Sequence, residues 1–351
     1  MKISLASIIK TEKRKIKNNV FTFFKNDFVA FQNRLLKLYV IVSKRRLDEK
    51  KVEEEFVGII NNFIKKLELF EKSLQRKNVI SKVKRIFGDL VLDLSKGSIL
   101  FKNSYLKPRG YPGDYKIMEA FYDNKPLSNG IAALWDRYIL NDHYVIAVRN
   151  RKDSAKQMLC SLISKAYSKK IKILNLGCGS CRELRELFNE NLFIDKFLDV
   201  TLIDQDKKAL DYAKEKLKII PSNIKCNFVQ KTIYSLLYRT SLEFKQMLSA
   251  QDLVYSIGLA DYLPDIILGK MMEFAFDLLN PHGKIVIAHK NAKRFRYPAS
   301  DWFCDWHFIA RNKREVLSLV KRYLKGRKFS ISLNEDSTKR VFFVTIRKNI
   351  R

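Results

Sequence analysis

The sequence predicts an α/β protein in which a doubly wound parallel sheet, closed by an antiparallel hairpin, follows an α-helical N-terminal domain. Residues 1–100 contain almost no glycine or proline and repeat apolar residues at helical spacing. From about residue 156 onward, short apolar segments alternate with amphipathic ones, which is typical of parallel strands joined by helices. The first apolar segment, at 173–176, runs into a glycine-punctuated turn and then a polar helix.

Apolar residues in the N-terminal region recur every three to four positions, and we expect them to form the core of a helical domain. The clearest series is Phe56, Ile59, Ile60, Phe63, Ile64 and Leu67. The first break is the segment 107–115, where two prolines and two glycines in nine residues predict a rigid loop. Amphipathic helices follow this loop and end near the basic segment 149–151.

The C-terminal region reads as a regular series of strands and helices. We expect strands at 173–176, 202–204, 224–229, 252–256, 284–288, 329–333 and 341–346. Helices are expected at 182–189, 207–219, 267–279 and 314–324. Turns are expected at 280–283 and 334–338, where glycine, proline, asparagine and aspartate gather. The last two strands would form the closing hairpin.

The turn after the first strand has the features of a nucleoside-binding site. Gly177 and Gly179 let the backbone turn sharply and approach a ligand closely. The following helix points free N–H groups and a partial positive charge at that ligand. Asp204, at the end of the next strand, can accept hydrogen bonds from both hydroxyls of a ribose, and Asp206 is the alternative if the strand ends later.

The glycine pattern distinguishes between nucleosides. A dinucleotide fingerprint needs a small residue where Arg182 stands, so NAD is disfavoured. The segment 175–179 instead resembles the S-adenosylmethionine (SAM) loop of class I SAM-dependent methyltransferases, with Cys181 replacing the third glycine. The resemblance covers 156–351 and implies a Rossmann-like SAM-binding domain, with residues 1–155 as a helical substrate or lid domain.

The resemblance assigns the residues that would contact SAM. Loop residues would cover the methionine part, Asp204 or Asp206 the ribose, and Gln205 and Thr232 the adenine, while the loop after the fourth strand would present the methyl group. The full set is Asn175, Gly177, Cys178, Gly179, Asp204, Gln205, Asp206, Thr232, Tyr255 and Gly258. Thr232 stands where many methyltransferases place an acid beside the adenine amino group.

Three further segments resemble a narrower family, the 3-hydroxypalmitic acid methyl ester biosynthesis methyltransferases. They are 109–122 with 149–151, then 255–263, and 305–311. This resemblance implies O-methylation of a carboxylate, that of a fatty acid or of a related small molecule or peptide, with the loop that contains Arg109 folded over the site. Ala260 stands where that family usually has phenylalanine or tyrosine, a difference that bears on the acyl pocket.

A carboxylate acceptor needs an anchor but no general base, because it is already ionised at neutral pH. Tyrosine and histidine can orient it by single hydrogen bonds and arginine by a bidentate pair. The candidates are Tyr111, Tyr115, His143, Arg149 and Tyr262. On a hydroxyl acceptor, His143 would instead serve as a general base.

The net charge of +31 leaves other functions open. It suggests an RNA or other nucleic-acid methyltransferase, although the lysines are spread along the chain and Tyr255–Gly258 is not the Asp/Asn-Pro-Pro-Tyr motif of base-amino enzymes. A non-catalytic SAM-fold binding protein is a second alternative. We expect a small-molecule or acyl carboxylate as partner, no nucleic acid, no metal at Cys178 and Cys181, no membrane span and a cytoplasmic location. Oligomeric state is not predicted.

Overall fold

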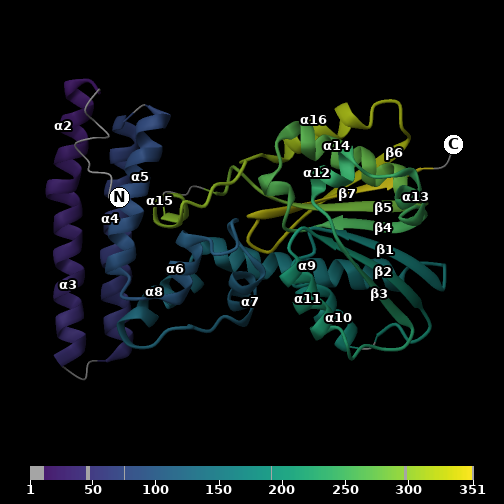
Figure 1. Cartoon of the computed structure of the whole chain (residues 1–351), viewed down its shortest axis with the longest axis horizontal. Helices are drawn as coiled ribbons and strands as arrows, with labels where there is room; N and C mark the ends of the chain where they lie inside the picture. The colour runs from purple at the N-terminus through teal and green to yellow at the C-terminus, as the bar shows by residue number, and fades with distance from the viewer. Residues whose placement is uncertain (1–11, 45–47, 75, 191, 296–298, 350–351) are drawn as a thin grey trace. The chain divides into compact units, whose positions relative to one another are not determined.

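The computed structural model describes residues 12–44, 48–74, 76–190, 192–295 and 299–349. The chain divides into two compact units (Figure 1). The first unit contains the chain up to Asp142 and a later segment that ends at His307, and the second unit contains the rest. The domain boundary predicted after residue 155 therefore falls inside one helix, α9 (His143–Ser164), which lies wholly in the second unit.

The first unit is helical, as the N-terminal sequence predicted. Its elements are α2 (Arg14–Thr22), the π-helical turn η1 (Phe23–Phe28), α3 (Val29–Lys44), α4 (Glu49–Leu74), α5 (Lys77–Leu94), α6 (Ile99–Leu106), α7 (Tyr115–Asp123), α8 (Gly130–Leu140) and α15 (Ala299–Cys304). Aromatic rings fill its core: Phe23 stacks on Phe70 with centroids 3.9 Å apart, and Phe31 stacks on Phe63 at 4.1 Å. Such pairs bury large apolar areas, and they account for the helical apolar spacing in this region.

The second unit contains a seven-stranded sheet with the order β3-β2-β1-β4-β5-β7-β6. The strands are β1 (Lys170–Leu176), β2 (Phe197–Asp204), β3 (Ile224–Gln230), β4 (Gln251–Ser256), β5 (Leu279–Lys290), β6 (Phe329–Glu335) and β7 (Val341–Lys348). The first five strands are mutually parallel, and β7 pairs antiparallel with both β5 and β6. This is the strand order of the class I methyltransferase fold, and the predicted fold class is confirmed.

Helices cover both faces of this sheet (Figure 1). Helices α9, α10 (Arg182–Asn189) and α11 (Lys207–Lys216) pack on one face, with a core that includes Ile173 and Val286. Helices α12 (Ile233–Tyr238), α14 (Asp265–Leu278) and α16 (Lys313–Tyr323) pack on the other, against Leu174 and Ile285. The remaining elements of this unit are α13 (Leu242–Met247) and the 3-10 turn η2 (Ala260–Tyr262). Successive strand residues face opposite sides of the sheet, and both sides are covered, which explains why residues 285–288 of β5 are all apolar.

The predicted turn at 280–283 is wrong in one respect, because these residues belong to the start of β5. The pairing of β4 with β5 shifts register there: Gln251 pairs with Leu279, but Leu253 pairs with Lys284. His282 has a φ of 64°, and a Cβ at Gly283 would lie 2.8 Å from the carbonyl oxygen of Gln251. The turn-forming residues therefore produce a bulge at the strand entrance rather than a separate loop.

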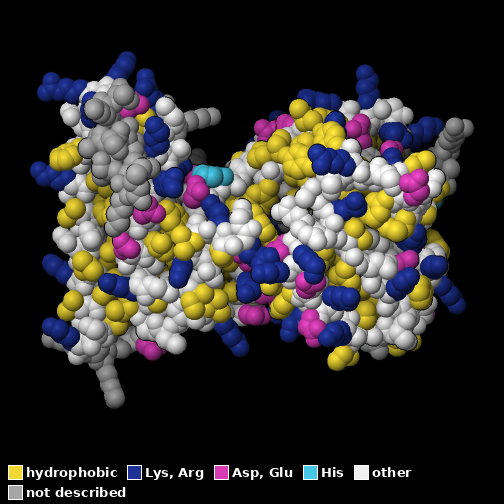
Figure 2. Space-filling view, in the orientation of Figure 1, with side chains coloured by type: hydrophobic (Ala, Val, Ile, Leu, Met, Phe, Trp, Pro, Cys, Tyr) yellow, Lys and Arg dark blue, Asp and Glu magenta, His cyan; other side chains and the backbone are white. Residues whose placement is uncertain are grey.

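Basic side chains are scattered over the visible surface rather than gathered in one patch (Figure 2). Such dispersion agrees with a charge spread along the sequence. Among the described residues, no helix is long and apolar enough to cross a lipid bilayer.

Candidate functional site

The loop after β1 is fixed to the end of β2 by backbone hydrogen bonds. The amides of Gly177 and Cys178 both donate to the carbonyl oxygen of Ile203, at 2.9 and 3.0 Å. Gly177 and Gly179 have φ values of 72° and 53°, which residues with a side chain rarely adopt. A Cβ added at Gly179 would meet no atom within 4 Å, so the space beside this loop is open to a ligand.

Asp204 links this loop to the carboxyl end of β2. Its Oδ2 accepts a hydrogen bond from the Gly179 amide at 2.8 Å, and its Oδ1 accepts one from the Asp206 amide at 2.9 Å. Each oxygen keeps a second lone pair, so the carboxylate can still accept bonds from a diol. Burial raises the pKa of Asp204, and the backbone N–H groups that it accepts from offset only part of this effect.

Three of the other predicted cofactor residues have structural roles or lie at the surface. The Asp206 side chain caps α11 by accepting from the amides of Lys208 and Ala209. Thr232 caps α12 in the same way, accepting from Ser235 at 3.0 Å. Gln205 is exposed between β2 and α11. Asp204 is thus the more available acid at this strand end, and the roles assigned to Gln205 and Thr232 stay predictions.

Asn175 and Tyr255 lie behind the glycine loop, where both side chains meet Glu183 of α10. The Tyr255 hydroxyl donates to Glu183 Oε1 at 2.8 Å and accepts from Asn175 Nδ2 at 2.8 Å. Asn175 Nδ2 also lies 3.2 Å from Glu183 Oε1. All three residues are at most 3% exposed, and burial raises the pKa of Glu183. Sequence reasoning missed Glu183, whose only signal was an acid in the first turn of the helix after the loop.

This buried group leaves one acceptor unused. Within the described part of the chain, Asn175 Oδ1 is buried and has no hydrogen-bond partner. A buried acceptor without a partner costs free energy, on the order of 1–3 kcal/mol, unless a ligand or water donates to it. Asn175 at the carboxyl end of β1 is therefore suited to meet a donor group of a ligand bound at the loop.

Cys178 and Cys181 pack into the core beneath the loop, at 7% and 1% exposure. Burial raises the pKa of both thiols, which keeps them protonated and unreactive at neutral pH. Across the ranges that the structure describes, no group of three or more His, Cys, Asp or Glu side chains is arranged to hold a metal ion. Both side chains pack among apolar residues beneath the loop, and the contact of Cys178 with the cofactor stays a prediction.

A second buried polar group lies where β4 and β5 end, next to the strand that carries the glycine loop. Asp261, in η2 just after β4, is 1% exposed, and Lys290, the last residue of β5, is 5% exposed. The Lys290 amide donates to Asp261 Oδ1 at 2.9 Å, and its ammonium lies 3.5 Å from Asp261 Oδ2. Arg151 of α9 approaches the same carboxylate at 3.7 Å.

The ionisation of this pair follows from burial and from its neighbours. Burial acts to raise the pKa of Asp261, but attraction to Lys290, His289 and Arg151 outweighs it and lowers the pKa. Burial holds the pKa of Lys290 well below its usual range, although Asp261 opposes this shift. The carboxylate is thus fixed as an anion, while the lysine is easier to deprotonate than a surface lysine.

Aromatic side chains surround the Lys290 ammonium. Its Nζ donates to the Tyr144 hydroxyl at 2.7 Å and lies 2.9 Å from the centre of the Phe308 ring. The Tyr262 ring centre is 5.8 Å away, and Tyr262 packs on Phe308 at 5.3 Å. Rings around a cation stabilise it electrostatically and exclude water. Neither Tyr144 nor Lys290 was singled out from the sequence. The available signal was a lysine two positions after the apolar segment 285–288.

Arg311 holds the loop beyond η2 in place. Its guanidinium contacts Asp265 Oδ1 at 2.7 Å, donates to the carbonyl oxygen of Leu263 at 2.6 Å and meets His289 Nε2 at 3.2 Å. Because these partners belong to separate segments, Arg311 stabilises the loops that carry Asp261 and Tyr262.

The predicted acceptor-binding residues fall in both units. In the second unit, His143 is exposed at the start of α9, Arg149 is half-buried and has a pKa lowered by burial, and Tyr262 lies in the aromatic group around Lys290. In the first unit, Tyr115 begins α7, and the guanidinium carbon of Arg109 lies 5.3 Å from the centre of its ring. Tyr111 is half-buried in the loop before it. Gly258 follows β4, and a Cβ there would approach Arg151 Nη2 at 3.8 Å.

Comparison with known proteins finds no matching family model and no matching curated protein. Among solved structures, the chain is similar to a "possible exported protein" from Bordetella parapertussis, at 17% identity and a TM-score of 0.50, over 68% of this chain and 80% of that one. It also matches the N-methyltransferase NodS from Bradyrhizobium japonicum WM9 in complex with S-adenosyl-L-homocysteine, at 15% identity and a TM-score of 0.41, over 67% and 97% of the two chains. A third match is magnesium protoporphyrin IX methyltransferase from Synechocystis PCC 6803, at 10% identity and 0.43, over 59% and 88%. At these identities the likeness concerns the fold.

Proposed function

We propose that this protein is a SAM-dependent methyltransferase. The observation that carries the proposal is the contact of Asp204 at the end of β2 with the Gly179 amide in the loop after β1. It places a carboxylate and a glycine turn at the switch point of a sheet in the methyltransferase strand order, where nucleosides bind in such folds. The two solved methyltransferases of similar fold described above, both with S-adenosyl-L-homocysteine bound, agree with this proposal.

The residues at this edge fit SAM in chemistry as well as position. Asp204 would accept the ribose hydroxyls, and the open side of Gly179 would admit the methionine part. The unused Asn175 Oδ1 is suited to accept from an ammonium group. When bound, SAM supplies an electrophilic methyl group on a sulfonium, from which an ionised carboxylate can displace the thioether without losing a proton.

We propose a carboxylate as the acceptor, most specifically that of a fatty acid or related small molecule. The ends of β4 and β5 support this choice, because a buried ammonium, Lys290, and a hydroxyl, Tyr144, lie there within an aromatic surround. A cation and a hydroxyl can orient a carboxylate, and the rings keep water away from it. Asp261 limits the net charge of this end and keeps Lys290 in place. Arg149, Tyr262, Tyr111, Tyr115 and His143 remain candidate acceptor-binding residues, to be tested by kinetics.

Deuteromethyl-labelled SAM provides the direct test of acceptor class. The enzyme is incubated with a lipid and metabolite extract and, separately, with total RNA, and labelled products are found by mass spectrometry. We expect label in an ester that mild alkali hydrolyses to labelled methanol. Label in nucleosides of digested RNA would replace the carboxylate proposal with a nucleic-acid one. SAM binding without transfer to either pool would favour a non-catalytic binding protein.

A further inference from the structure

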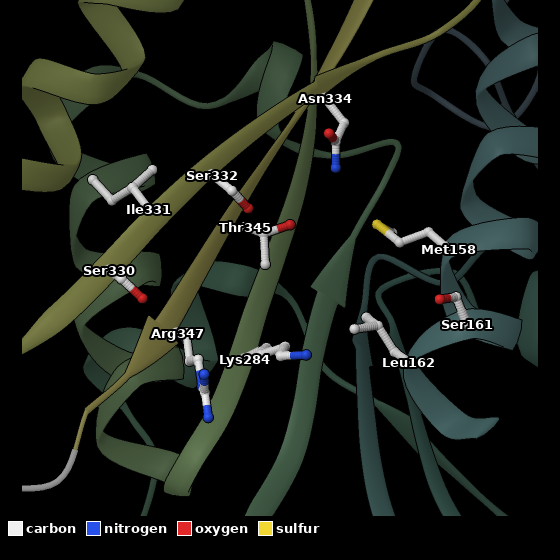
Figure 3. Close-up of a pocket in the computed structure, with 10 residues that line it drawn as sticks. All are labelled: Met158, Ser161, Leu162, Lys284, Ser330, Ile331, Ser332, Asn334, Thr345 and Arg347. Carbon is white, nitrogen blue, oxygen red and sulfur yellow. The ribbon is translucent and has the colours of Figure 1, made fainter. Parts of the chain in front are cut away.

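A second concave site lies on the sheet, where β5, β7 and β6 extend beside α9. It is a groove of 610 Å³. Its lining residues are Met158, Ser161, Leu162, Lys284, Ser330, Ile331, Ser332, Asn334, Thr345 and Arg347. Figure 3 shows these side chains on three strands and on the neighbouring helix, with the Lys284 amino group directed toward Leu162. Lys284 lies in the middle of β5, and none of the lining residues belongs to the proposed methyl-transfer site.

Strand register explains why polar groups gather there. Lys284 of β5 pairs with Arg347 of β7, which pairs in turn with Ser330 of β6. In the next row on the same face, Thr345 pairs with Ser332. Directly paired side chains lie about 5 Å apart. Two cations and three hydroxyls therefore line one small area of the sheet.

The cations of this groove are not neutralised by the protein. Burial lowers the pKa of Lys284, and the nearby charges of Arg347 and Lys165 lower it further. Over the described ranges, none of these three residues forms an ion pair. Arg347 Nη2 meets only His282 Nδ1, at 3.4 Å, which neutralises no charge. Like charges directly opposite each other on neighbouring strands destabilise a sheet.

Protection of the sheet edge does not account for this arrangement. Charged residues on an edge strand can prevent one sheet from pairing with another. Here the edge strand is β6, which contributes serines, whereas Lys284 and Arg347 lie on β5 and β7 in the interior of the sheet. Lys284 is half-buried and Arg347 is exposed, so an anion from solvent can reach the space between the two cations and relieve their repulsion.

We propose that this groove binds the phosphoryl group of a small phosphorylated molecule. Arg347 and Lys284 would contact the phosphoryl oxygens, as arginine and lysine do in many phosphate sites. The hydroxyls of Ser330, Ser332 and Thr345 would donate to the remaining oxygens. Met158 and Leu162 of α9 form an apolar wall for the rest of the ligand.

The test uses Lys284→Gln, which removes one cation and keeps a side chain of similar length. Without ligand, the melting temperature should rise or stay unchanged, because the substitution relieves repulsion between like charges. With ADP as the probe, calorimetry should show binding to the wild type and binding at least about tenfold weaker to the variant, since bonds to charged groups are among the strongest. Arg347→Gln should weaken ADP binding in the same way.

Lys225→Gln is the matched control, because Lys225 is an exposed lysine on β3 of the same sheet. It should bind ADP like the wild type, and sodium chloride titrated at equal ionic strength should not reproduce the calorimetric signal of ADP binding. Inorganic phosphate and adenosine, tested separately, show whether the phosphoryl group is the part recognised. Equal ADP binding by the wild type and Lys284→Gln, or none by either, would overturn the proposal.

A short RNA oligonucleotide tests the other source of phosphoryl groups. Binding of RNA but not of ADP or phosphate, lost in Lys284→Gln, would overturn the assignment to a small molecule and indicate a nucleic-acid contact. Neither readout uses SAM or a methyl acceptor. A negative result for phosphoryl binding therefore does not bear on the proposed methyltransferase function. A negative result for methyl transfer likewise does not bear on phosphoryl binding in this groove.

Discussion

The two ends of the proposed active site are built differently. At the β1 and β2 end, the contacts are made mainly by the backbone: the amides of Gly177 and Cys178 bond to the carbonyl oxygen of Ile203, and the amide of Gly179 bonds to the carboxylate of Asp204. At the β4 and β5 end, the contacts are made by side chains, chiefly the buried ion pair of Asp261 and Lys290. In the proposed function, the cofactor is therefore held by a loop that backbone hydrogen bonds fix, whereas the acceptor is held by side chains that come together from separate segments.

The largest expected effect comes from removing the buried carboxylate at the β4 and β5 end of the site. Asp261→Asn keeps the shape but leaves Lys290 and Arg151 without their buried anion, so we expect a loss of about 3–5 kcal/mol in the free energy of unfolding. Urea denaturation followed by circular dichroism measures it. Asp211→Asn is the control, because Asp211 is exposed and pairs with Lys207 on the surface of α11. A loss for Asp261→Asn as small as for Asp211→Asn would show that the buried pair contributes little.

The buried group behind the glycine loop comes next. Tyr255→Phe removes a hydroxyl that donates to Glu183 and accepts from Asn175, so about 1–3 kcal/mol of stability should be lost. Tyr234→Phe, at a tyrosine that is 51% exposed, should change stability by less than about 0.5 kcal/mol. Equal melting temperatures for the two variants would contradict this role of Tyr255.

Kinetics sharpen the assignment of the acceptor end. Tyr144→Phe keeps the ring beside Lys290 and removes only the hydroxyl, and Arg149→Lys keeps the charge but loses the planar fork. If these groups position the acceptor, kcat/KM for the methylated acid should fall by about tenfold to a hundredfold, roughly 1.4–2.7 kcal/mol. The same range applies to Tyr115→Phe in the first unit. Wild-type kinetics in a variant would assign its residue a purely structural role.

The smallest expected effect concerns pH. Burial raises the pKa of Asp204, so in the free protein this carboxylate begins to protonate at a higher pH than an ordinary aspartate. SAM binding that needs the anion should be complete above that pKa and weaken as pH falls through it, by at most about tenfold per pH unit. Asp204→Asn should bind weakly with no such dependence. An identical pH profile in wild type and variant would assign the titration to another group.

The sequence predicted the β1 and β2 end of the site more fully than the β4 and β5 end. Gly177 and Gly179 mark a turn by local rules, and Asp204 directly ends an apolar strand, so neither inference needed a distant contact. The parallel sheet with a closing hairpin followed from the alternation of elements. The turn at 280–283 was misread, because the bulge at Gly283 depends on the pairing of β5 with β4.

The β4 and β5 end could not be predicted, because the residues that interact there are far apart in the sequence. Lys290 meets Tyr144, 146 positions away, and Asp261, 29 positions away. Glu183 meets Tyr255, 72 positions away, so Tyr255 could be assigned to the cofactor region but not to its buried contact. A lysine after a strand reads as a surface residue unless the fold that buries it is known.

Calorimetric titration with SAM tests the central claim most directly. The wild type should bind SAM, and Asp204→Ala should bind at least about tenfold more weakly, because it removes a charge-assisted acceptor worth about 1.5–3 kcal/mol per hydrogen bond. Asp211→Ala, on the neighbouring helix α11, should bind like the wild type, and Asp206→Ala should lose stability through its helix cap more than affinity. Unchanged SAM affinity in Asp204→Ala, or no binding by the wild type, would contradict the account.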